Sequence, residues 1–158
     1  MHAVGDIDEL NAAIGLLKSD MTPQDRYFAF LEQVQHSLTL FMGEVVAEAE
    51  KRKHYVDNYD YVKEADLDSL DTQVNLLQDM SELDQQGWVL YGNSKLGAKA
   101  DFTSKVCRRA ERSFLAIIDE ESEEPEENQC RPVLQKYLNR LSDFFHLAAR
   151  YFDHLKTL

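Results

Sequence analysis

The strongest constraint on the fold is the spacing of apolar residues, which follows the turn of an α-helix through most of the chain. In the clearest segment, apolar residues recur at alternating intervals of four and three, which places them on one face of a helix. They are Tyr27, Leu31, Val34, Leu38, Phe41 and Val45. The same spacing predicts a C-terminal helix with Leu134, Leu138, Leu141, Phe145, Ala148 and Phe152 on one face. Because no segment shows the alternation typical of strands, the sequence predicts an all-α protein.

Shorter stripes predict three more helices. They cover residues 7–17, 67–80 and 102–117, the last with Phe102, Val106, Ala110, Phe114 and Ile117 on its apolar face. Asp6 is predicted to cap the first helix, and Thr22-Pro23 to start the second, since proline is tolerated in a first turn. These apolar helix faces predict a single domain over residues 1–158 that folds as a five-helix up-and-down bundle.

Three stretches without helical spacing are predicted as connections. They are the polar, tyrosine-rich residues 53–62, the glycine-containing residues 85–97 and the acidic residues 119–131. The acidic stretch holds seven carboxylates within nine residues, so it is predicted to be a mobile, solvated loop.

The formal net charge of −12 limits the partners of the chain. An acidic surface repels nucleic-acid phosphates and anionic membranes, so neither is expected as a partner. No apolar run approaches the roughly 18 residues of a membrane span, and the N-terminus lacks the layout of a secretory signal. The two cysteines, Cys107 and Cys130, are therefore predicted to be reduced thiols of a cytoplasmic protein.

Two polar stripes lie on helices that already have an apolar face. The first consists of Lys105, Arg108, Arg109 and Arg112. Several cations on one helix face suit a polyphosphate, and Glu111 is placed to orient one of the arginines. The second consists of Asn139, Asp143, His146 and Arg150, which can hydrogen-bond a nucleoside or hold an arginine. Spacing alone leaves open that either stripe is an ordinary solvated face.

Other kinds of site lack their motifs. A di-iron bundle needs two Glu-x-x-His motifs, whereas the nearest approach is a single Asp143-x-x-His146. The two cysteines lack the spacing of zinc ligands. The glycine-rich phosphate-binding motifs GxxxxGK[ST] and GxGxxG do not occur. The sequence therefore predicts no metal site.

Three sequence blocks point to a known family. They are GDIDELNAAIG at 5–15, VCRRAERS at 106–113 and YLNRLSDFFHLAARY at 137–151. In sequence and in order they resemble blocks of the PduO-type ATP:cob(I)alamin adenosyltransferases, with RRAER and YLNRLSD the most specific. The blocks lie on the first, fourth and fifth predicted helices, so the resemblance spans most of the chain.

This resemblance implies a homotrimer of helical bundles with each active site between two subunits. It implies that the chain binds ATP with Mg²⁺ and transfers the 5′-deoxyadenosyl group to cob(I)alamin. In that reaction the cobalt(I) nucleophile attacks the ribose C5′ and triphosphate leaves. The protein binds ATP in a bent, open conformation and makes the corrin four-coordinate. It therefore positions the substrates and supplies an electrostatic field, whereas the reactive atom belongs to the corrinoid.

The matched blocks also imply roles for particular residues. Arg108 matches the family's ATP-contacting arginine, and with it the resemblance assigns Asn139 and Asp143 to catalysis. The residues assigned to binding ATP or corrinoid are Asp8, Trp88, Arg109, Glu111 and Arg112. Residues 88–93 (WVLYGN) fall on the family's FILPGG segment, so Trp88 replaces the phenylalanine that occupies the lower corrin face.

Several departures from the family bear on activity. The TGD-type loop that cradles ATP phosphates has no counterpart in this sequence. The family's His-x-Ala-Arg reads Asp101-Phe102-Thr103-Ser104, so Ser104 stands where an arginine pairs across subunits with the aspartate matching Asp8. Three hypotheses follow: an active adenosyltransferase, a non-catalytic corrinoid- or nucleotide-binding relative or trimeric interaction module, and an unrelated helical bundle.

Overall fold

The computed structural model describes residues 2–83 and 88–157, which form an all-helical protein. Its α-helices are α1 His2–Lys18, α2 Phe28–Val46, α3 Arg52–Asn58, α4 Glu64–Gln78, α5 Lys95–Glu120 and α6 Pro132–Thr157. Short 3₁₀ turns lie at η1 Ala49–Lys51, η2 Ser81–Leu83 and η3 Glu126–Asn128. No described residue lies in a strand, which confirms the prediction of an all-α fold.

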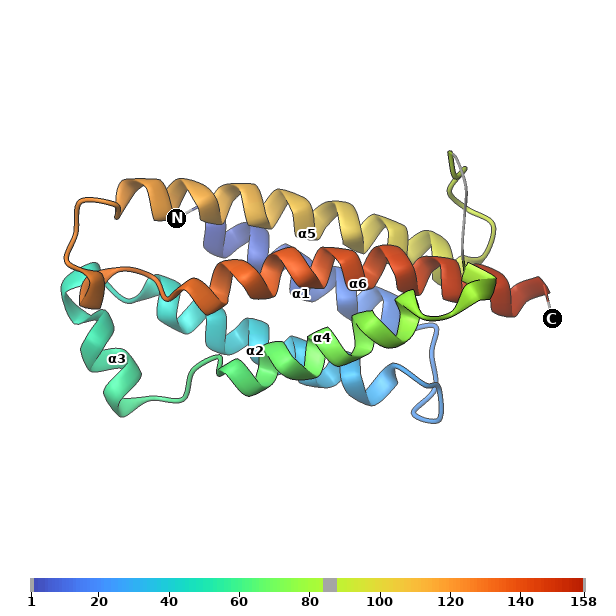
Figure 1. Ribbon diagram of the computed structural model, residues 1–158, viewed down its shortest axis with the longest axis horizontal. Helices are drawn as coiled ribbons and strands as arrows, with labels where there is room; N and C mark the ends of the chain where they lie inside the picture. Colours follow the sequence, from blue (N-terminus) through green and yellow to red (C-terminus); the bar gives the residue numbers. More distant parts are fainter. Residues whose placement is uncertain (1, 84–87, 158) are drawn as a thin grey trace.

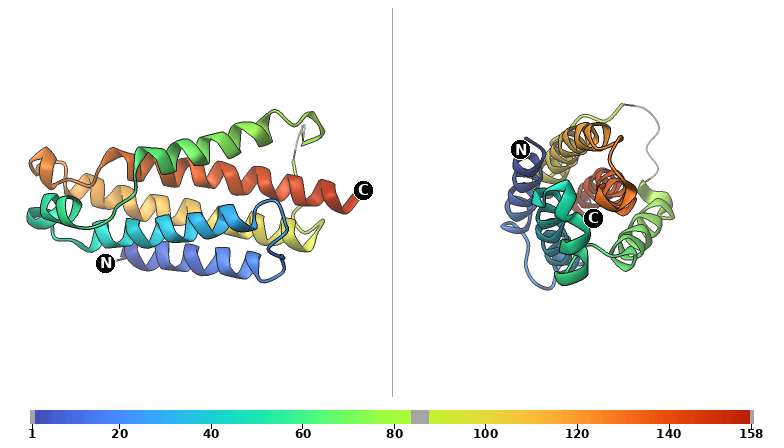
Figure 2. Two further views of the ribbon diagram at one scale, coloured as in Figure 1. Left: turned by 90° about the horizontal axis from the view of Figure 1, so that it is seen from below. Right: turned by 90° about the vertical axis from the view of Figure 1, so that its left-hand side faces the viewer.

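The long helices lie along one common axis as a bundle (Figures 1 and 2). Consecutive long helices run in opposite directions, so the topology is up-and-down, as predicted. The longest two, α5 and α6, have 26 residues each and pack against one another. Helix α1 packs on the other side of α5, and α4 packs on the other side of α6. None of the described helices combines the length and apolar character that crossing a membrane requires.

The predicted stripes of α2 and α6 supply the core, because every residue named in them is buried. Aromatic side chains join the helices: Tyr27 meets Phe144 edge-on at 5.4 Å between ring centroids, and Phe41 meets Phe114 at 5.0 Å. Such edge-to-face pairs add specific geometry to the burial of apolar area. Phe102, by contrast, is exposed, so its place in the predicted apolar stripe was wrong. The inward positions of this turn belong to its neighbours Thr103 and Ser104, which are buried.

Both predicted helix starts were wrong. Helix α1 begins at His2, so Asp6 lies inside the helix and accepts a hydrogen bond from Ser113 on α5 instead of capping. Helix α2 begins at Phe28, after a turn in which the Thr22 amide donates to the Asp25 carboxylate at 2.6 Å. The carboxylate competes for backbone donors and keeps Thr22-Pro23 in the turn.

The predicted connections hold more structure than the sequence indicated. The stretch 53–62 contains most of α3, a sixth α-helix among the described residues. In the stretch 85–97, residues 85–87 lie outside the described residues, and α5 already begins at Lys95. In the acidic stretch, residues 123–127 are exposed as predicted, but Glu121 is not a solvated carboxylate. It pairs with the buried Arg52 at 2.6 Å and accepts the Cys130 amide at 2.8 Å.

Candidate functional site

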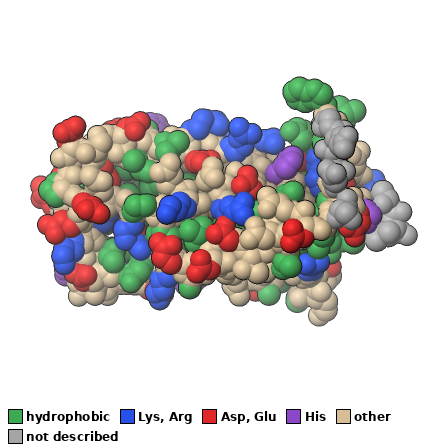
Figure 3. Space-filling view, viewed as in Figure 1, with side chains coloured by type: hydrophobic (Ala, Val, Ile, Leu, Met, Phe, Trp, Pro, Cys, Tyr) green, Lys and Arg blue, Asp and Glu red, His purple; other side chains and the backbone are tan. Residues whose placement is uncertain are grey.

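A polar groove of about 560 Å³ runs between α5 and α6. Its α5 bank is lined by Ser104, Lys105, Arg108 and Glu111, and its α6 bank by Asn139, Ser142, Asp143 and His146. Tyr91, from the segment before α5, also lines it. The groove thus brings together one part of each polar stripe identified in the sequence. The face shown in Figure 3 carries basic side chains along α5, with acidic and histidine side chains beside them.

The antiparallel packing of α5 and α6 sets the floor of the groove. The Ser104 hydroxyl donates to the Ser142 carbonyl at 3.2 Å, and the Cys107 thiol donates to the Leu138 carbonyl at 3.4 Å. These small side chains let the helices approach closely. Longer polar side chains one position away then project along the two banks.

The cations of the groove remain available to a ligand. The Lys105 ammonium lies 5.1 Å from the centre of the Tyr91 ring, a cation–π contact. Arg108 is exposed and has no ion-pair partner among the described residues. Two cations facing one polar cleft form a site that suits a polyphosphate.

The opposite bank carries hydrogen-bonding groups. The Asn139 amide donates to the Glu111 carboxylate at 3.0 Å, so Glu111 bridges the two helices rather than orienting an arginine as the sequence suggested. Asp143 lies 3.5 Å from Arg140, which is itself held by Asp71 at 2.6 Å. The Asp143 carboxylate is half-exposed and keeps room for a ligand.

His146 is the titratable group at this site whose pKa is perturbed. Partial burial lowers the pKa of His146, and the charges of Arg150 and Lys105 lower it further, while Asp101 and Asp143 oppose them. The ring is therefore neutral at pH 7 and available as a hydrogen-bond donor or acceptor.

Five residues of the predicted site and its polar stripes lie away from the groove. Arg109 points toward α1, where it pairs with Glu9 and lies 3.8 Å from Asp6. Arg112 and Asp8 are exposed and do not line the groove. Arg150, expected in the second stripe, is buried and pairs with Asp101 and Asp153. The helical turn explains the position of Arg109, which lies about 100° around α5 from Arg108. Arg112 lies one turn beyond Arg108 on the same side of α5 but is not among the residues that line the groove.

The fifth of these, Trp88, lies on residues 88–94, which we call the aromatic loop. Trp88 is fully exposed, and Leu90 and Tyr91 are exposed beside it. Hydrophobic side chains project from this end of the molecule in Figure 3, next to the start of α5. Gly92 has a φ of 100°, a conformation that side chains disfavour, which accounts for the one glycine kept from the family's FILPGG segment. Through Tyr91 the loop reaches the groove.

Sequence reasoning missed two groove residues, Tyr91 and Ser142. Ser142 lies inside the YLNRLSD block, so its signal was present but was not assigned a role. Tyr91 gave no periodic signal, because it lies outside any helix.

The two cysteines are not candidates for a nucleophile. Both are free and buried. Burial raises the pKa of Cys107 well above its usual range and that of Cys130 to about 12. Both thiols are protonated at neutral pH and are therefore unreactive.

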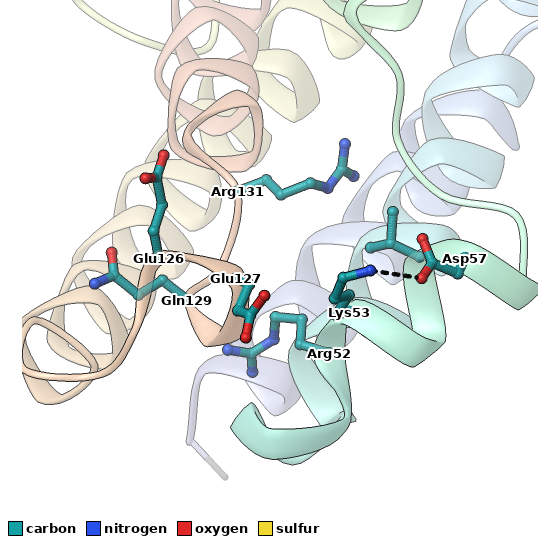
Figure 4. A pocket seen from close by; sticks show the side chains of 8 residues that line it. Arg52, Lys53, Asp57, Glu126, Glu127, Gln129 and Arg131 are labelled. Atoms are coloured by element: carbon teal, nitrogen blue, oxygen red, sulfur yellow. Dashed lines mark hydrogen bonds and ion pairs between the residues drawn. The ribbon is translucent and has the colours of Figure 1, made fainter.

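A second hollow, of about 220 Å³, lies at the other end of the bundle between α3 and residues 126–131 (Figure 4). Arg52, Lys53 and Arg131 supply its cations, but each has a carboxylate partner. Arg52 pairs with Glu121, and Arg131 pairs with the fully buried Glu44 at 2.6 Å. This hollow is therefore a poorer anion site than the groove.

Fold and groove together define an all-helical protein with a polar, cation-bearing cleft between its two longest helices. The cobalamin adenosyltransferase family model matches residues 1–152, and the chain belongs to this family. It is 31% identical to the corrinoid adenosyltransferase PduO of Citrobacter freundii over 98% of this chain and 42% of that protein. It is 32% identical to the corrinoid adenosyltransferase of Bacillus subtilis over 95% of this chain and 72% of that protein.

The fold resembles a solved structure from the same family. A variant of the PduO-type ATP:corrinoid adenosyltransferase from Lactobacillus reuteri, complexed with cobalamin and ATP, superimposes with a TM-score of 0.82 at 25% identity. The match covers 98% of this chain and 78% of that one. The chain thus spans less than half of the Citrobacter relative and about three quarters of the Bacillus and Lactobacillus proteins.

Proposed function

We propose that this chain transfers the 5′-deoxyadenosyl group of ATP to cob(I)alamin. The observation that carries the proposal is the groove itself, in which residues from the two most specific family blocks face one cleft. The reaction forms a bond between cobalt and the ribose C5′ and breaks the bond between C5′ and the triphosphate oxygen. Cobalt(I) supplies the electron pair of the new bond, and the electron pair of the broken C5′–O bond leaves with the triphosphate.

Lys105 and Arg108 would hold the phosphates, because they are the groove's cations. Charge-assisted hydrogen bonds to phosphate are strong, and arginine offers a fork that matches two oxygens at once. As triphosphate leaves, negative charge grows on its oxygen atoms, so the same cations stabilise the transition state more than the bound substrate.

Asn139 and Asp143 would orient the nucleoside from the α6 bank. The bond from Asn139 to Glu111 fixes the amide, which leaves its carbonyl oxygen free to accept a ribose or adenine donor. Asp143 and Glu111 are also hard oxygen donors of the type that Mg²⁺ uses when it arrives with a nucleotide.

The aromatic loop would receive the corrinoid. Trp88 and Leu90 are exposed apolar side chains at the groove end marked by Tyr91, where a flat macrocycle could cover them. Burial of exposed apolar area on binding supplies affinity. An indole against the lower corrin face would exclude a lower axial ligand, as the family resemblance implies for this position.

We also place this reaction in a cytoplasmic homotrimer. Asp8, Phe102 and Arg112 are exposed and do not line the groove of their own subunit, so a neighbouring subunit could contact them. Light scattering should give three times the chain mass of 18.3 kDa. A monomeric mass at working concentration would exclude shared sites.

A binding role without catalysis is the second candidate, and Ser104 favours it. Ser104 stands where the family resemblance implies an arginine that pairs across subunits. Its side chain is buried and donates to Ser142 within the same subunit, so it cannot reach a neighbour.

The test is ATP-dependent formation of adenosylcobalamin from cob(I)alamin, followed by absorbance under strong reducing conditions. The first proposal expects turnover that requires both ATP and Arg108. Purified protein that binds ATP and corrinoid but forms no adenosylcobalamin would establish the binding role instead. Protein that binds neither compound would contradict both candidates.

A further inference from the structure

The aromatic loop ends in a buried tie to the last turns of α6. Ser94 caps α5 by accepting the Gly97 amide at 2.9 Å, and its hydroxyl donates to Asp153 on α6 at 2.7 Å. Both side chains are buried. One serine therefore fixes where α5 begins and where the loop meets α6.

A second tie lies one residue earlier. The Lys156 ammonium, also on α6, donates to the Asn93 carbonyl. The side-chain amide of Asn93 donates to the Leu90 carbonyl at 3.3 Å, across the turn made by Gly92. The chain from Leu90 to Ser94 is thus bound to α6 at two successive residues.

Behind Asp153 lies a line of buried charges. Arg150 lies 3.2 Å from Asp153 and pairs with Asp101 on α5. All three residues are less than one tenth exposed. Burial raises the pKa of Asp101, and Arg150 opposes that shift. This line connects the loop anchor to the end of the groove, where Arg150 also acts on His146.

The cost of these charges argues against a purely stabilising role. Buried ion pairs seldom stabilise a fold more than apolar residues of similar volume would. Asp101 Oδ1, Arg150 Nε and Arg150 Nη1 also lack a hydrogen-bond partner among the described protein atoms. What the charges provide is a fixed direction for Asp153, and hence for Ser94.

Gly97 shows how closely the anchor is fitted. A Cβ atom at this position would overlap the Asp153 carboxylate and lie 2.6 Å from the Ser94 hydroxyl. Glycine is therefore required by the close approach of Asp153 to the first turn of α5, not by the helix itself.

We propose that Ser94 and Asp153 are positioning residues that hold the aromatic loop, and with it Trp88, at the end of the groove. For its effect on corrinoid binding the inference rests on the proposed function, but for the position of the loop it does not. Neither residue need touch the substrate, because each acts through the backbone of residues 90–94.

Trp88 makes the test direct, because it is the only tryptophan in the chain. Its time-resolved fluorescence anisotropy reports motion of the loop on the nanosecond scale without any ligand. Ser94→Ala and Asp153→Ala should roughly halve the slow component of the anisotropy, since loops released from an anchor move on this timescale. Ser94→Thr, which keeps the hydroxyl, should restore it.

Glu121→Gln is the matched control, because it removes a carboxylate partner of a buried arginine at the opposite end of the bundle. It should lower stability without changing the anisotropy of Trp88. Unchanged anisotropy in both Ser94→Ala and Asp153→Ala, with the helical circular dichroism intact, would overturn the inference. An equal change in Glu121→Gln would overturn it too, since general loosening would then explain the result.

Titration with cob(II)alamin and with MgATP separates this inference from the proposed function. In Ser94→Ala, corrinoid affinity should fall about tenfold while ATP affinity stays unchanged, the signature of a displaced apolar platform. If the anisotropy falls but wild-type protein binds no corrinoid, the loop anchor stands and the proposed function fails. If wild-type protein binds corrinoid and a mobile loop leaves that affinity unchanged, the positioning role is overturned.

Discussion

The same residue type serves two different purposes in the two cationic regions of this molecule. At the α3 end, Arg52 is buried and donates to the carbonyl oxygens of Glu44, Ala47 and Asn128 as well as to Glu121. In the groove, Arg108 is exposed and has no ion-pair partner among the described residues. One arginine is saturated with protein acceptors, and the other is left with its hydrogen-bonding capacity unused.

The difference shows that a cluster of cations is not by itself a binding site. Whether a cation can bind a ligand depends on whether the fold already supplies it with oxygen acceptors. The α3 end supplies them, including the buried carboxylate of Glu44 that holds Arg131. In the groove, Glu111 accepts from Asn139, and none of the described residues forms an ion pair with Arg108. The α3 end should therefore govern stability, and the groove should govern binding.

The largest effect should come from Arg52→Met. This change leaves three backbone carbonyls and the Glu121 carboxylate without their donor. Breaking a buried ion pair costs about 3–5 kcal/mol, which corresponds to a fall in Tm of about 10 °C for a chain of this size. Thermal and urea unfolding measure it, while ATP affinity should not change.

Lys53→Met is the matched control, because Lys53 is on the same helix and its pair with Asp57 is exposed. Exposed ion pairs contribute little to stability, so Tm should stay nearly constant. If both changes lowered Tm equally, burial of the ion pair would not be what makes Arg52 important for stability.

Arg108→Ala should reverse this pattern. The side chain is exposed, so unfolding should be unchanged, but ATP affinity should fall at least about tenfold, since each hydrogen bond to a charged group contributes roughly 1.5–3 kcal/mol. Calorimetric titration measures the change. Lys136→Ala removes the same charge from an exposed site on α6 outside the groove. Equal loss of affinity in both variants would mean that only overall charge matters.

Trp88→Ala should separate the aromatic loop from the cations. A fully exposed indole adds nothing to folding, so Tm should hold, while corrinoid affinity should fall roughly fivefold to tenfold through lost apolar contact. Trp88→Phe should keep most of the affinity. If corrinoid affinity were unchanged in Trp88→Ala, the aromatic loop would have no role in corrinoid binding.

The sequence predicted the fold well wherever burial set the pattern. Tyr27, Leu38 and Phe145 are core residues because a helix in a bundle must hide one face. The sequence-based predictions were wrong where local hydrogen bonds or partners distant in sequence determined the structure. The carboxylate of Asp25 delays the start of α2, and Arg52 draws Glu121 out of solvent across 69 positions of sequence.

The candidate site was predictable in part for the same reason. Spacing placed Lys105 and Arg108 on one face and Asn139 and Asp143 on another, and antiparallel packing of α5 and α6 brought the two faces together. Spacing could not show that Arg109 would be taken by Glu9 on α1, nor that Arg150 would be buried between Asp101 and Asp153. Those outcomes depend on contacts between helices, which periodicity within one helix does not contain.

The smallest expected effect concerns pH and distinguishes the groove from the α3 end once more. Burial and the cations Arg150 and Lys105 lower the pKa of His146 below its ordinary 6.5. Between the folded pKa and 6.5, the unfolded chain binds a proton that the folded chain does not, so His146 adds stability above pH 6.5 that is lost as pH falls through this window. Ligand binding should respond in the opposite sense. Below its folded pKa, His146 becomes a further cation in the groove beside Lys105 and Arg108.

Tripolyphosphate affinity should therefore rise by about twofold to threefold between pH 7.5 and 5.5, beyond the change that the ligand's own titration produces, because a partly exposed charge contributes little. His146→Gln keeps a polar side chain but cannot take up the proton, so its affinity should follow only the ligand's titration. Equal pH profiles for wild type and His146→Gln would show that the ring does not face the bound phosphates. No histidine is among the described residues that line the hollow at the α3 end, so no corresponding response is expected there.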